Sequence, residues 1–491
     1  MTITLLGLGP GHPDLLTRSA WQVLQNAPEI HLRTRQHPAV AAFPARLAVH
    51  SFDHLYESGE TFESVYEQII DRVLELAARS EGVVYGVPGH PLIAEATGPE
   101  ILRRAREAAI PVRVVAGLSF IEPVFEALEI DPFPQTALVD AFDLARGHAP
   151  SARFDRPVLV AQVHSRRMAS EVKLTLMALY PDEHPVRLVH GAGTDRLLVE
   201  DLALWEIDRS DQIGLLTSLY LPPLPENTSF ESFLEIVSRL RAPDGCPWDR
   251  EQTHLSLRPF LLDEVYEALD ALDRDAPEEL AEELGDLLFQ IVFHAVIAAE
   301  AGDFTMADVL KGIGDKLVRR HPHVFDGLAV DGVDEIIRNW DRLKAEEKLA
   351  KKGSAERAPG SILDGVPRGL PALAQASSLQ RRASRTGFEW PDIGGVFDKL
   401  EEELDELRNA PEAERASELG DVLFVLAHLA NWYGFSAEDA LRETNLRFRE
   451  RFGYVEEAVR AAGRSLGEMT LDDMNVLWEE AKRGRSGKSG S

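Results

Sequence analysis

The chain contains the same pattern of four carboxylates twice, and this internal repeat constrains its fold more than any other feature. In each copy two acids stand three residues apart, and a second pair at the same spacing follows a short turn. Three helical residues turn through about 300° and rise about 4.5 Å, so each pair lies on one face of a helix. The second pair lies within an apolar run that packs its helix against the first. The acids are Glu264, Glu267, Glu283 and Asp286 in the first copy and Glu403, Glu406, Glu418 and Asp421 in the second.

Four carboxylates at one edge of a helix pair require cations. Two such charges about 5 Å apart, at an effective dielectric constant of about 20, repel by about 3 kcal/mol. Because the ligands are oxygens without His or Cys, the pattern indicates Mg²⁺, with Mn²⁺ as the second choice. One acidic pair at this spacing usually marks a solvated helix face. A set that occurs twice inside apolar stripes favours a metal site.

Length and composition exclude several classes of protein. With 491 residues, the chain is too long for one core, and 44% hydrophobic and 27% charged residues are typical of a globular protein. The net charge of -30 argues against general nucleic-acid binding. Cys246 is the only cysteine, so we expect no intrachain disulfide and a reducing cytoplasm. The apolar run 287–299 is too short to span a membrane, and no signal peptide is expected.

The pattern of elements changes along the chain. Before the proline-rich stretch 221–229, β-rich runs alternate with helical runs, which predicts an α/β domain; beyond it the pattern is all-α. A second break at 348–371 separates the two carboxylate copies. The predicted domains are therefore 1–222, 230–347 and 371–484. The predicted strands are Ile3–Leu8, Val83–Val87, Val112–Val115, Pro157–Gln162 and Val186–His190.

Basic residues follow the carboxylates in both copies. Each copy continues into a basic helix and ends with a Trp and a Lys four residues later, Trp340 in the first and Trp478 in the second. These cations are expected to contact phosphate oxygens, which together with the metal site predicts hydrolysis of a nucleoside triphosphate. Surface ion pairing is the alternative for the arginines, and core packing for the tryptophans. The cations are Lys316, Arg320 and Lys344 in the first copy, and Lys399, Arg447, Arg451 and Lys482 in the second.

Residues 230–484 resemble the MazG family of nucleoside triphosphate pyrophosphohydrolases. The motifs CPWD, ELGDLLFQ, RRHPHVF and the terminal Trp-x-x-x-Lys carry the resemblance. It implies an all-α fold, Mg²⁺ dependence, a homodimer, and cleavage of nucleoside triphosphates to monophosphate and pyrophosphate. The family's metal ligands match the eight acids above, and the resemblance favours catalysis by the second copy. Asp263 replaces the first Glu of the signature, and Arg447 stands where Lys is common. The expected catalytic residues are Glu403, Glu406, Lys399, Arg447, Arg451 and Lys482.

Three glycine-rich segments in the first 222 residues follow predicted strands. They are 7–17 (GLGPGHPDLLT), 85–92 (YGVPGHPL) and 114–120 (VVAGLSF). Each alone is consistent with an ordinary turn, and none has the GxGxxG or phosphate-loop spacing. Because the carboxyl ends of parallel strands meet at one sheet edge, the three segments are expected to converge on a ligand there.

Together with GAGT (191–194), these segments resemble the tetrapyrrole (corrin/porphyrin) methylase family, which binds S-adenosylmethionine. The resemblance implies cofactor contacts at Pro10, Gly86, Pro88, Gly89, His90, Ser119 and Thr194. Stand-alone methylases usually carry Gly-Asp-Pro where this chain has Gly-His-Pro. The Gly-His-Pro motif is usual in proteins that fuse this domain to MazG. The departure argues against a tetrapyrrole substrate more than against the fold.

Two alternatives remain open at this level. In the first, methylation with S-adenosylmethionine is the main activity and the helical half is a dimerising accessory. In the second, the helical half binds nucleotides without turning them over.

Overall fold

The computed structural model describes residues 2–58, 61–150, 152–352 and 361–486. The chain divides into two compact units, Met1–Asp315 and Lys316–Ser491, and each is described by itself. The boundary lies within a helix of the first carboxylate copy, so that copy contributes to both units.

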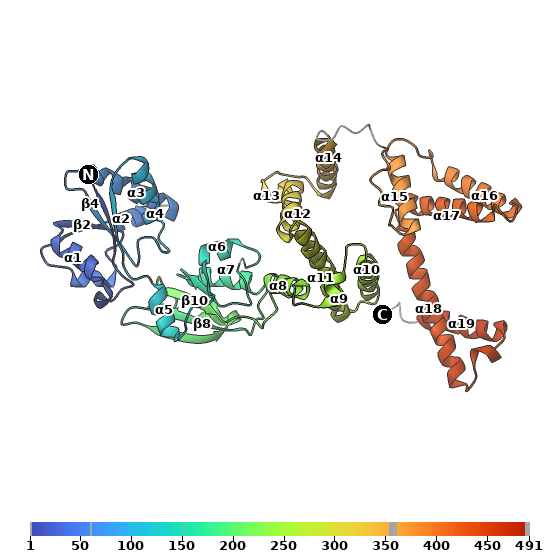
Figure 1. Cartoon of the computed structure of the whole chain (residues 1–491), viewed down its shortest axis with the longest axis horizontal. Coiled ribbons are helices and arrows are strands. Elements are labelled where there is room, and N and C mark those ends of the chain that lie inside the picture. The colour runs from blue at the N-terminus through green and yellow to red at the C-terminus, as the bar shows by residue number, and fades with distance from the viewer. Residues whose placement is uncertain (1, 59–60, 151, 353–360, 487–491) are drawn as a thin grey trace. The chain divides into compact units, whose positions relative to one another are not determined.

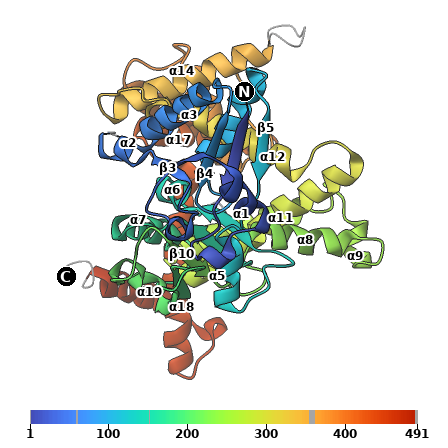
Figure 2. The ribbon, with the colours of Figure 1, turned by 90° about the vertical axis from the view of Figure 1, so that its left-hand side faces the viewer.

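The first unit begins with a five-stranded parallel sheet whose strand order is β3-β2-β4-β1-β5 (Figure 1). β1 is largely buried on both faces, as expected for a parallel sheet covered on both sides. α3 and α4 pack on one face and α1 on the other (Figure 1). Figure 2 shows β3, β4 and β5 of this sheet from the side of the N-terminal domain. The strands are β1 (Ile3–Gly7), β2 (Glu29–Leu32), β3 (Ala48–Ser51), β4 (Val83–Val87) and β5 (Val112–Val115); the helices are α1 (Arg18–Asn26), α2 (Asp53–Ser58), α3 (Phe62–Ala77) and α4 (Thr97–Glu107).

A second five-stranded sheet follows, with strand order β6-β7-β10-β8-β9. β6 runs parallel to β7, and the other neighbours are antiparallel. α6 and α7 share a core with this sheet, and α5 belongs to a separate core cluster with β8 and β10. The strands are β6 (Ala137–Asp140), β7 (Val158–Ala161), β8 (Pro185–His190), β9 (Leu198–Ala203) and β10 (Thr217–Leu221); the helices are α5 (Ile121–Leu128), α6 (Ala141–Arg146) and α7 (Arg166–Leu176).

The predicted α/β region is confirmed, and all five predicted strands are present with ends shifted by at most a residue or so. The sequence analysis did not identify β2, β3, β6, β9 or β10. β2 and β3 are four residues long and carry His and Glu, so they lack the apolar signal of a central strand. Short 3₁₀ turns occupy Pro13–Leu15, Pro38–Ala42, Leu204–Arg209 and Leu466–Glu468.

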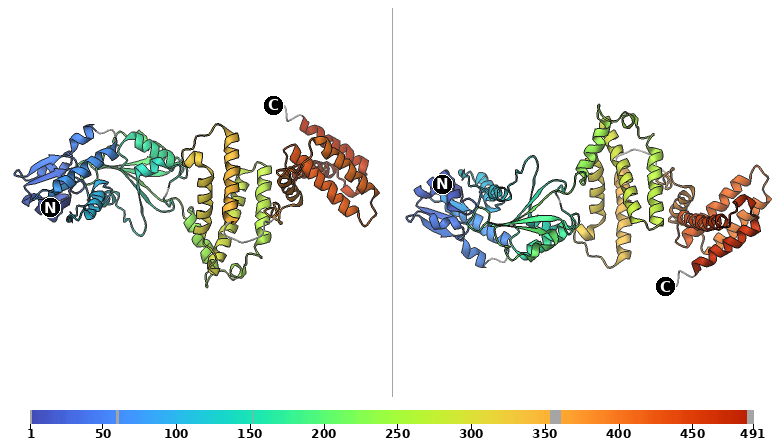
Figure 3. Two further views of the ribbon diagram at one scale, coloured as in Figure 1. Left: turned by 90° about the horizontal axis from the view of Figure 1, so that it is seen from above. Right: turned by 90° about the horizontal axis from the view of Figure 1, so that it is seen from below.

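The remainder of the described chain is helical, as predicted. α10 and α11 lie side by side and form a hairpin (Figure 3). Cys246 is the N-cap of α9 and Pro247 is its first helical residue, so the cysteine lies at a helix entry. The helices that start in the first unit are α8 (Phe230–Arg241), α9 (Pro247–Glu251), α10 (Arg258–Asp273), α11 (Pro277–Ala301) and α12 (Met306–Arg320).

In the second unit α16 packs along α17, and α15 packs against α17. α14 continues into the break predicted at 348–371, of which residues 353–360 lie outside the described part of the chain. The helices are α13 (Pro322–Phe325), α14 (Val333–Lys352), α15 (Ala372–Ser384), α16 (Ile393–Asn409), α17 (Arg415–Trp432), α18 (Ala437–Ala461) and α19 (Leu471–Ser486).

α11 is the one helix among the described residues that is long and apolar enough to cross a membrane by those two measures. Its mean hydropathy over an 18-residue window is 1.5. The core helix of a soluble protein passes the same test, and α11 carries Glu283 and Asp286 near its start, so this is weak evidence for a membrane span.

Candidate functional site

The α16–α17 hairpin gathers the carboxylates of the second copy. One oxygen from each of Glu403, Glu406 and Glu418 lies within 4.8 Å of the other two. The first two come from one face of α16, and the third comes from the first turn of α17. The i, i+3 spacing and the short turn between the helices therefore produce the predicted cluster. Asp421 lies outside this tightest group, one turn further along α17.

Like charge dominates the electrostatics of this cluster. Partial burial raises the pKa of Glu418, and the negative charges of Glu406, Asp421 and Glu403 raise it further. Asp421 therefore acts on the cluster although it stands outside the closest three. A group of acids that hinder one another's ionisation is the environment in which a divalent cation binds favourably.

Lys399 is the cation in direct contact with this cluster. Its Nζ lies 2.8 Å from Glu403 and 2.9 Å from Glu402, one turn along the same helix. Glu403 is buried, with 6% of its surface exposed, so this ion pair offsets part of the cost of burying its charge. Hydrogen bonds from Lys399 to the two glutamates raise the pKa of its ammonium group.

The other expected cations of the second copy have different partners. Arg447 donates to Thr444 at 2.7 Å and lies 3.4 Å from Glu443. The Arg451 guanidinium lies 5.8 Å from the centre of the Trp478 ring. Among the described residues, no ion pair joins Arg447, Arg451 or Lys482 to the four carboxylates.

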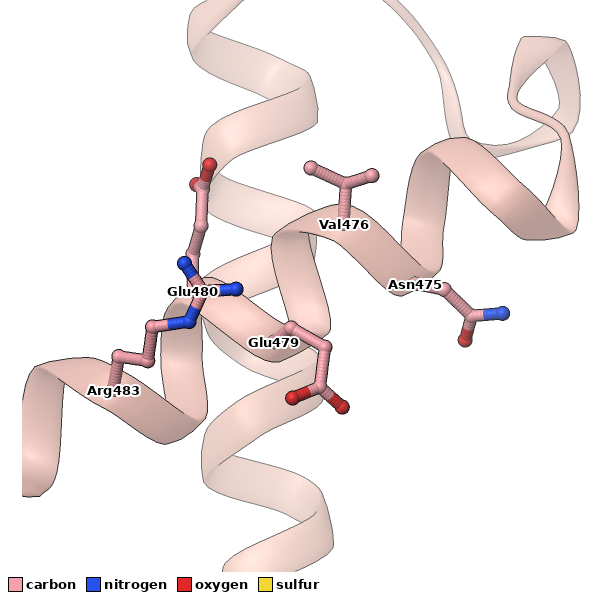
Figure 4. Close-up of a pocket in the computed structure, with 5 residues that line it drawn as sticks. All are labelled: Asn475, Val476, Glu479, Glu480 and Arg483. Carbon is pink, nitrogen blue, oxygen red and sulfur yellow. The ribbon is translucent and has the colours of Figure 1, made fainter.

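α19 carries Lys482, which pairs with Glu479 at 2.5 Å, and a shallow pocket of about 280 Å³. Figure 4 shows that all five lining side chains come from this one helix. Trp478 on the same helix lies 5.2 Å from the ring of Phe448, in agreement with a packing role for the tryptophan. The pocket is lined by Asn475, Val476, Glu479, Glu480 and Arg483.

The α10–α11 hairpin gathers the acids of the first copy in the same way. One oxygen from each of Glu264, Glu267 and Glu283 lies within 4.8 Å of the other two. Burial raises the pKa of Glu264, and the nearby charges, with Asp286 first among them, raise it further. The pKa of Glu283 is raised in the same direction, by partial burial and then by Glu267 and Asp286. Both copies therefore form an oxygen-only cluster that fits Mg²⁺ or Mn²⁺.

The cations of the first copy lie in the second unit. Arg320 pairs with Glu347 at 2.5 Å and lies over the ring of Trp340, 5.5 Å from its centre. Lys316 is exposed at the start of the unit, and the side chain of Lys344 lies outside the described part of the chain.

The three glycine-rich segments of the α/β region meet as predicted. They follow β4, β1 and β5, which are neighbours in the parallel sheet. Gly9 and Gly89 exchange backbone hydrogen bonds of 3.2 Å and 2.8 Å. A Cβ on Gly7 would lie 2.4 Å from the backbone nitrogen of Gly117, so only glycine fits between these loops. The loops therefore form one packed cradle at the carboxyl edge of the sheet.

The fourth motif, GAGT, joins this cradle from the second sheet. The backbone N–H of His12 donates to the Gly193 carbonyl at 2.7 Å. A Cβ on Gly193 would lie 2.6 Å from Pro10, and one on Gly11 would lie 2.4 Å from Thr194. Four segments far apart in the sequence are thus in direct contact.

The positions expected to touch a cofactor are not equivalent. A Cβ on Gly89 would meet nothing within 4 Å, so its backbone borders open space, whereas Gly86 lies in β4 against core side chains. Ser119 is 2% exposed, and its hydroxyl donates to Glu122. The Thr194 hydroxyl donates to the Gly191 carbonyl at 2.7 Å. His90 Nδ1 accepts from the Leu92 N–H at 3.1 Å, which stabilises the turn, and Pro88 precedes that turn.

His37 contacts the cradle at the Gly9 carbonyl, and the sequence did not identify it as part of this site. Its Nε2 lies 3.0 Å from the Gly9 carbonyl oxygen, and the residue is 7% exposed. Burial lowers the pKa of His37 to about 4, so the ring is neutral at pH 7 and donates this hydrogen bond. The two residues are 28 positions apart, and no local pattern signals their contact.

Comparison with known proteins supports both halves of this description. The family model of tetrapyrrole (corrin/porphyrin) methylases matches residues 2–205, and that of the MazG nucleotide pyrophosphohydrolase domain matches residues 252–325. Among solved structures, uroporphyrin-III C-methyltransferase from Thermus thermophilus matches 45% of this chain and 91% of its own, with 22% identity and a TM-score of 0.36.

Two curated relatives extend the match along the chain. Nucleoside triphosphate pyrophosphohydrolase from Escherichia coli K12 is 42% identical over 260 residues, which cover 52% of this chain and 97% of that protein. The uncharacterized protein YabN from Bacillus subtilis strain 168 is 40% identical over 490 residues, which cover 98% of each chain. The chain therefore belongs to the YabN family, with a tetrapyrrole methylase domain fused to a MazG nucleotide pyrophosphohydrolase region.

Proposed function

We propose that the helical half hydrolyses nucleoside triphosphates to the monophosphate and pyrophosphate with Mg²⁺, or Mn²⁺ in its place. One observation carries the proposal: two helix hairpins each hold a three-glutamate cluster within 4.8 Å, in a region 42% identical to a nucleoside triphosphate pyrophosphohydrolase. Relatives matched over this half bear that name, which favours hydrolysis over methylation as the main activity and over nucleotide binding without turnover.

Each residue of the second copy has a defined part in this proposal. Glu403, Glu406, Glu418 and Asp421 hold the divalent ions, which neutralise phosphate charge and polarise the phosphoryl group when bound. Lys399 orients Glu403 through their 2.8 Å ion pair. Arg447, Arg451 and Lys482 provide positive charge for phosphate oxygens on α18 and α19, and a glutamate of the cluster accepts the proton of the attacking water.

We also propose that the protein is a cytoplasmic homodimer. α17 leaves Leu419, Leu423 and Phe424 between 44% and 49% exposed, and α11 leaves Leu284 and Ile291 about as open. Large apolar side chains repeated along one helix are usually covered by another helix. In a homodimer, a second copy of the chain covers these side chains. Light scattering of the full-length protein measures the mass of the assembly directly.

A pyrophosphate-release assay tests the activity. The full-length protein is incubated with a panel of ordinary and damaged nucleoside triphosphates, with Mg²⁺ or with EDTA. We expect equimolar monophosphate and pyrophosphate with Mg²⁺ and none with EDTA. Mg²⁺-dependent nucleotide binding without product across the whole panel would support the binding-module alternative instead.

The packed cradle supports a second proposal, that the methylase domain binds S-adenosylmethionine. Four loop motifs meet there, and the backbone of Gly89 borders open space. Pro10, Pro88, Gly89, His90 and Thr194 are the residues at this edge that would hold it, and the cofactor would supply an electrophilic methyl group. Calorimetry with S-adenosylmethionine and with its demethylated product tests this, and absence of heat with both would exclude it.

A further inference from the structure

A cluster of one glutamate and two histidines lies at the edge of the first sheet, and neither proposed activity uses it. His31 on β2 and His50 on β3 are direct partners in the parallel register. Glu29 precedes His31 by two residues, so its side chain lies on the same face of β2. The fold thus brings three metal-ligating side chains together from two adjacent strands.

The distances within this cluster are close to those of a metal site. Nε2 of His31 lies 3.5 Å from one oxygen of Glu29, and Nε2 of His50 lies 3.5 Å from the other. One donor atom from each residue lies within 4.8 Å of the other two. Tetrahedral Zn²⁺ with bonds of about 2.0–2.1 Å separates its ligand atoms by about 3.4 Å. The side chain of His50 is 52% exposed, so it has room to rotate towards this spacing.

His31 supplies the second line of evidence. Its Nε2 is buried, and among the described residues its one polar approach is the long 3.5 Å contact with Glu29, which does not reach hydrogen-bond geometry. An unsatisfied buried nitrogen is costly, so it requires a partner.

The side chains around the cluster determine which of its atoms can bind an ion. Arg79, just beyond α3, lies 3.0 Å from Oε1 of Glu29, so Oε2 on the His50 side is the oxygen available to an ion. The rings of His31 and His50 stack with centroids 4.8 Å apart, and Phe52 stacks on the inner side of His31. Two imidazoles and one carboxylate select borderline metals such as Zn²⁺ over the Mg²⁺ suited to the helical clusters.

We propose that Glu29, His31 and His50 form a binding site for one zinc-class divalent transition-metal ion that links β3 to β2. Three protein ligands leave a fourth position for water at the exposed side of His50. The ion satisfies the buried nitrogen of His31 and ties down the edge strand β3, which has one strand neighbour in the sheet.

Cobalt titration of the full-length protein tests this site. Co²⁺ is the probe because its tetrahedral complexes absorb visible light strongly, whereas octahedral oxygen sites absorb weakly. The metal-stripped protein is first saturated with Mg²⁺ to occupy the carboxylate clusters. We expect one Co²⁺ per chain with a strong visible band that Zn²⁺ abolishes by competition, and a higher unfolding temperature with Zn²⁺.

His50→Ala should remove both the band and the Zn²⁺-dependent stabilisation. Because His50 is half-exposed, this variant is expected to fold, and an unchanged circular dichroism spectrum in EDTA checks that point. His148→Ala, which removes an exposed histidine elsewhere in the same domain, is the matched control and should keep the band. Absence of the band in the wild type, or its persistence in folded His50→Ala, would show that these residues form only a hydrogen-bonded cluster. Neither result depends on pyrophosphate release.

Discussion

The two helical copies carry the same acids at the same spacing, but they balance the charge differently. In the second copy Lys399 stands four residues before Glu403 and pairs with it at 2.8 Å. Four residues before Glu264, the first copy has Phe260, which is 40% exposed. The pKa is raised for two acids of the first cluster, Glu264 and Glu283, and for Glu418 in the second.

This difference shows that one residue on the same helix face can set how strongly a carboxylate cluster depends on cations. A buried carboxylate is stabilised either by a basic side chain or by a bound ion. The second cluster has its own lysine and is partly organised without metal. Among the described residues, no ion pair joins a basic side chain to the four acids of the first cluster; Arg274 at the end of α10 pairs with Asp270 and Glu279 instead. Divalent ions must therefore contribute more of the first cluster's stability.

The largest expected effect is loss of activity on neutralising the second cluster. Glu403→Gln combined with Glu418→Gln removes two proposed metal ligands, and several kcal/mol of transition-state stabilisation correspond to a loss of about 100-fold or more. Pyrophosphate release measures it, and Glu401→Gln, on the same helix outside the cluster, is the control. Full activity in the double variant would place the chemistry in the first copy or outside this half.

Neutralising the first cluster should have a smaller effect on turnover. For Glu264→Gln combined with Glu283→Gln, we expect pyrophosphate release to fall by less than about tenfold, because we propose that the second copy carries the chemistry. The same assay at saturating Mg²⁺ measures it. A loss as large as that of the second-copy variant would mean that both clusters are required for turnover.

Lys399→Met tests the role of the internal cation in stability. Without the ammonium group, the buried carboxylate of Glu403 has no partner in metal-free protein. We expect the unfolding temperature in EDTA to fall by about 2–4 °C, corresponding to about 1 kcal/mol. Saturating Mg²⁺ should restore most of this loss. As the control, Lys311→Met removes a lysine from an exposed pair with Asp315 and should change the unfolding temperature little. An equal fall in the unfolding temperature of this control would show that the pair at Glu403 contributes no more than an exposed pair.

The smallest effect is a pH-dependent stabilisation by Glu418→Gln without metal. The pKa of Glu418 in the folded chain is raised above its ordinary 4.5, so the folded state binds this proton more tightly than the unfolded state. Ionisation of Glu418 therefore lowers stability as the pH rises from about 4.5 through the raised pKa. In EDTA the variant should unfold at a higher temperature than wild type at pH 7, and the difference should disappear as the pH falls towards 4.5. If the stabilisation by Glu418→Gln grew as the pH fell, the pKa of Glu418 would not be raised in the folded chain.

Much of the helical half could be predicted because its signals are local. The spacing of Glu403 and Glu406 places both on one face of a helix, and the apolar run after Glu418 packs the next helix against it. The clusters therefore follow from two periodicities and a short turn. The expected meeting of Arg447, Arg451 and Lys482 with these acids depends on packing between separate helices, and the structure pairs these cations with other residues.

In the α/β half, most of the site depends on contacts between distant segments and could not be predicted from local sequence. The glycine-rich loops could be placed at strand ends, but the contact of Gly9 with Gly89 depends on which strands become neighbours. β2 and β3 are too short and polar to be identified from their sequence, so the meeting of His31 with His50 could not be predicted.

By itself, the sequence determined the repeated acid pairs, the helices that carry them and the class of cation they favour, because helix geometry relates residues three and four positions apart. Only the tertiary structure decided that Glu403, the i, i+4 partner of Lys399, is buried, that His37 supports the loop at Gly9, and that β2 and β3 present their histidines to each other. Those contacts depend on burial and strand order, which arise from packing of the whole domain.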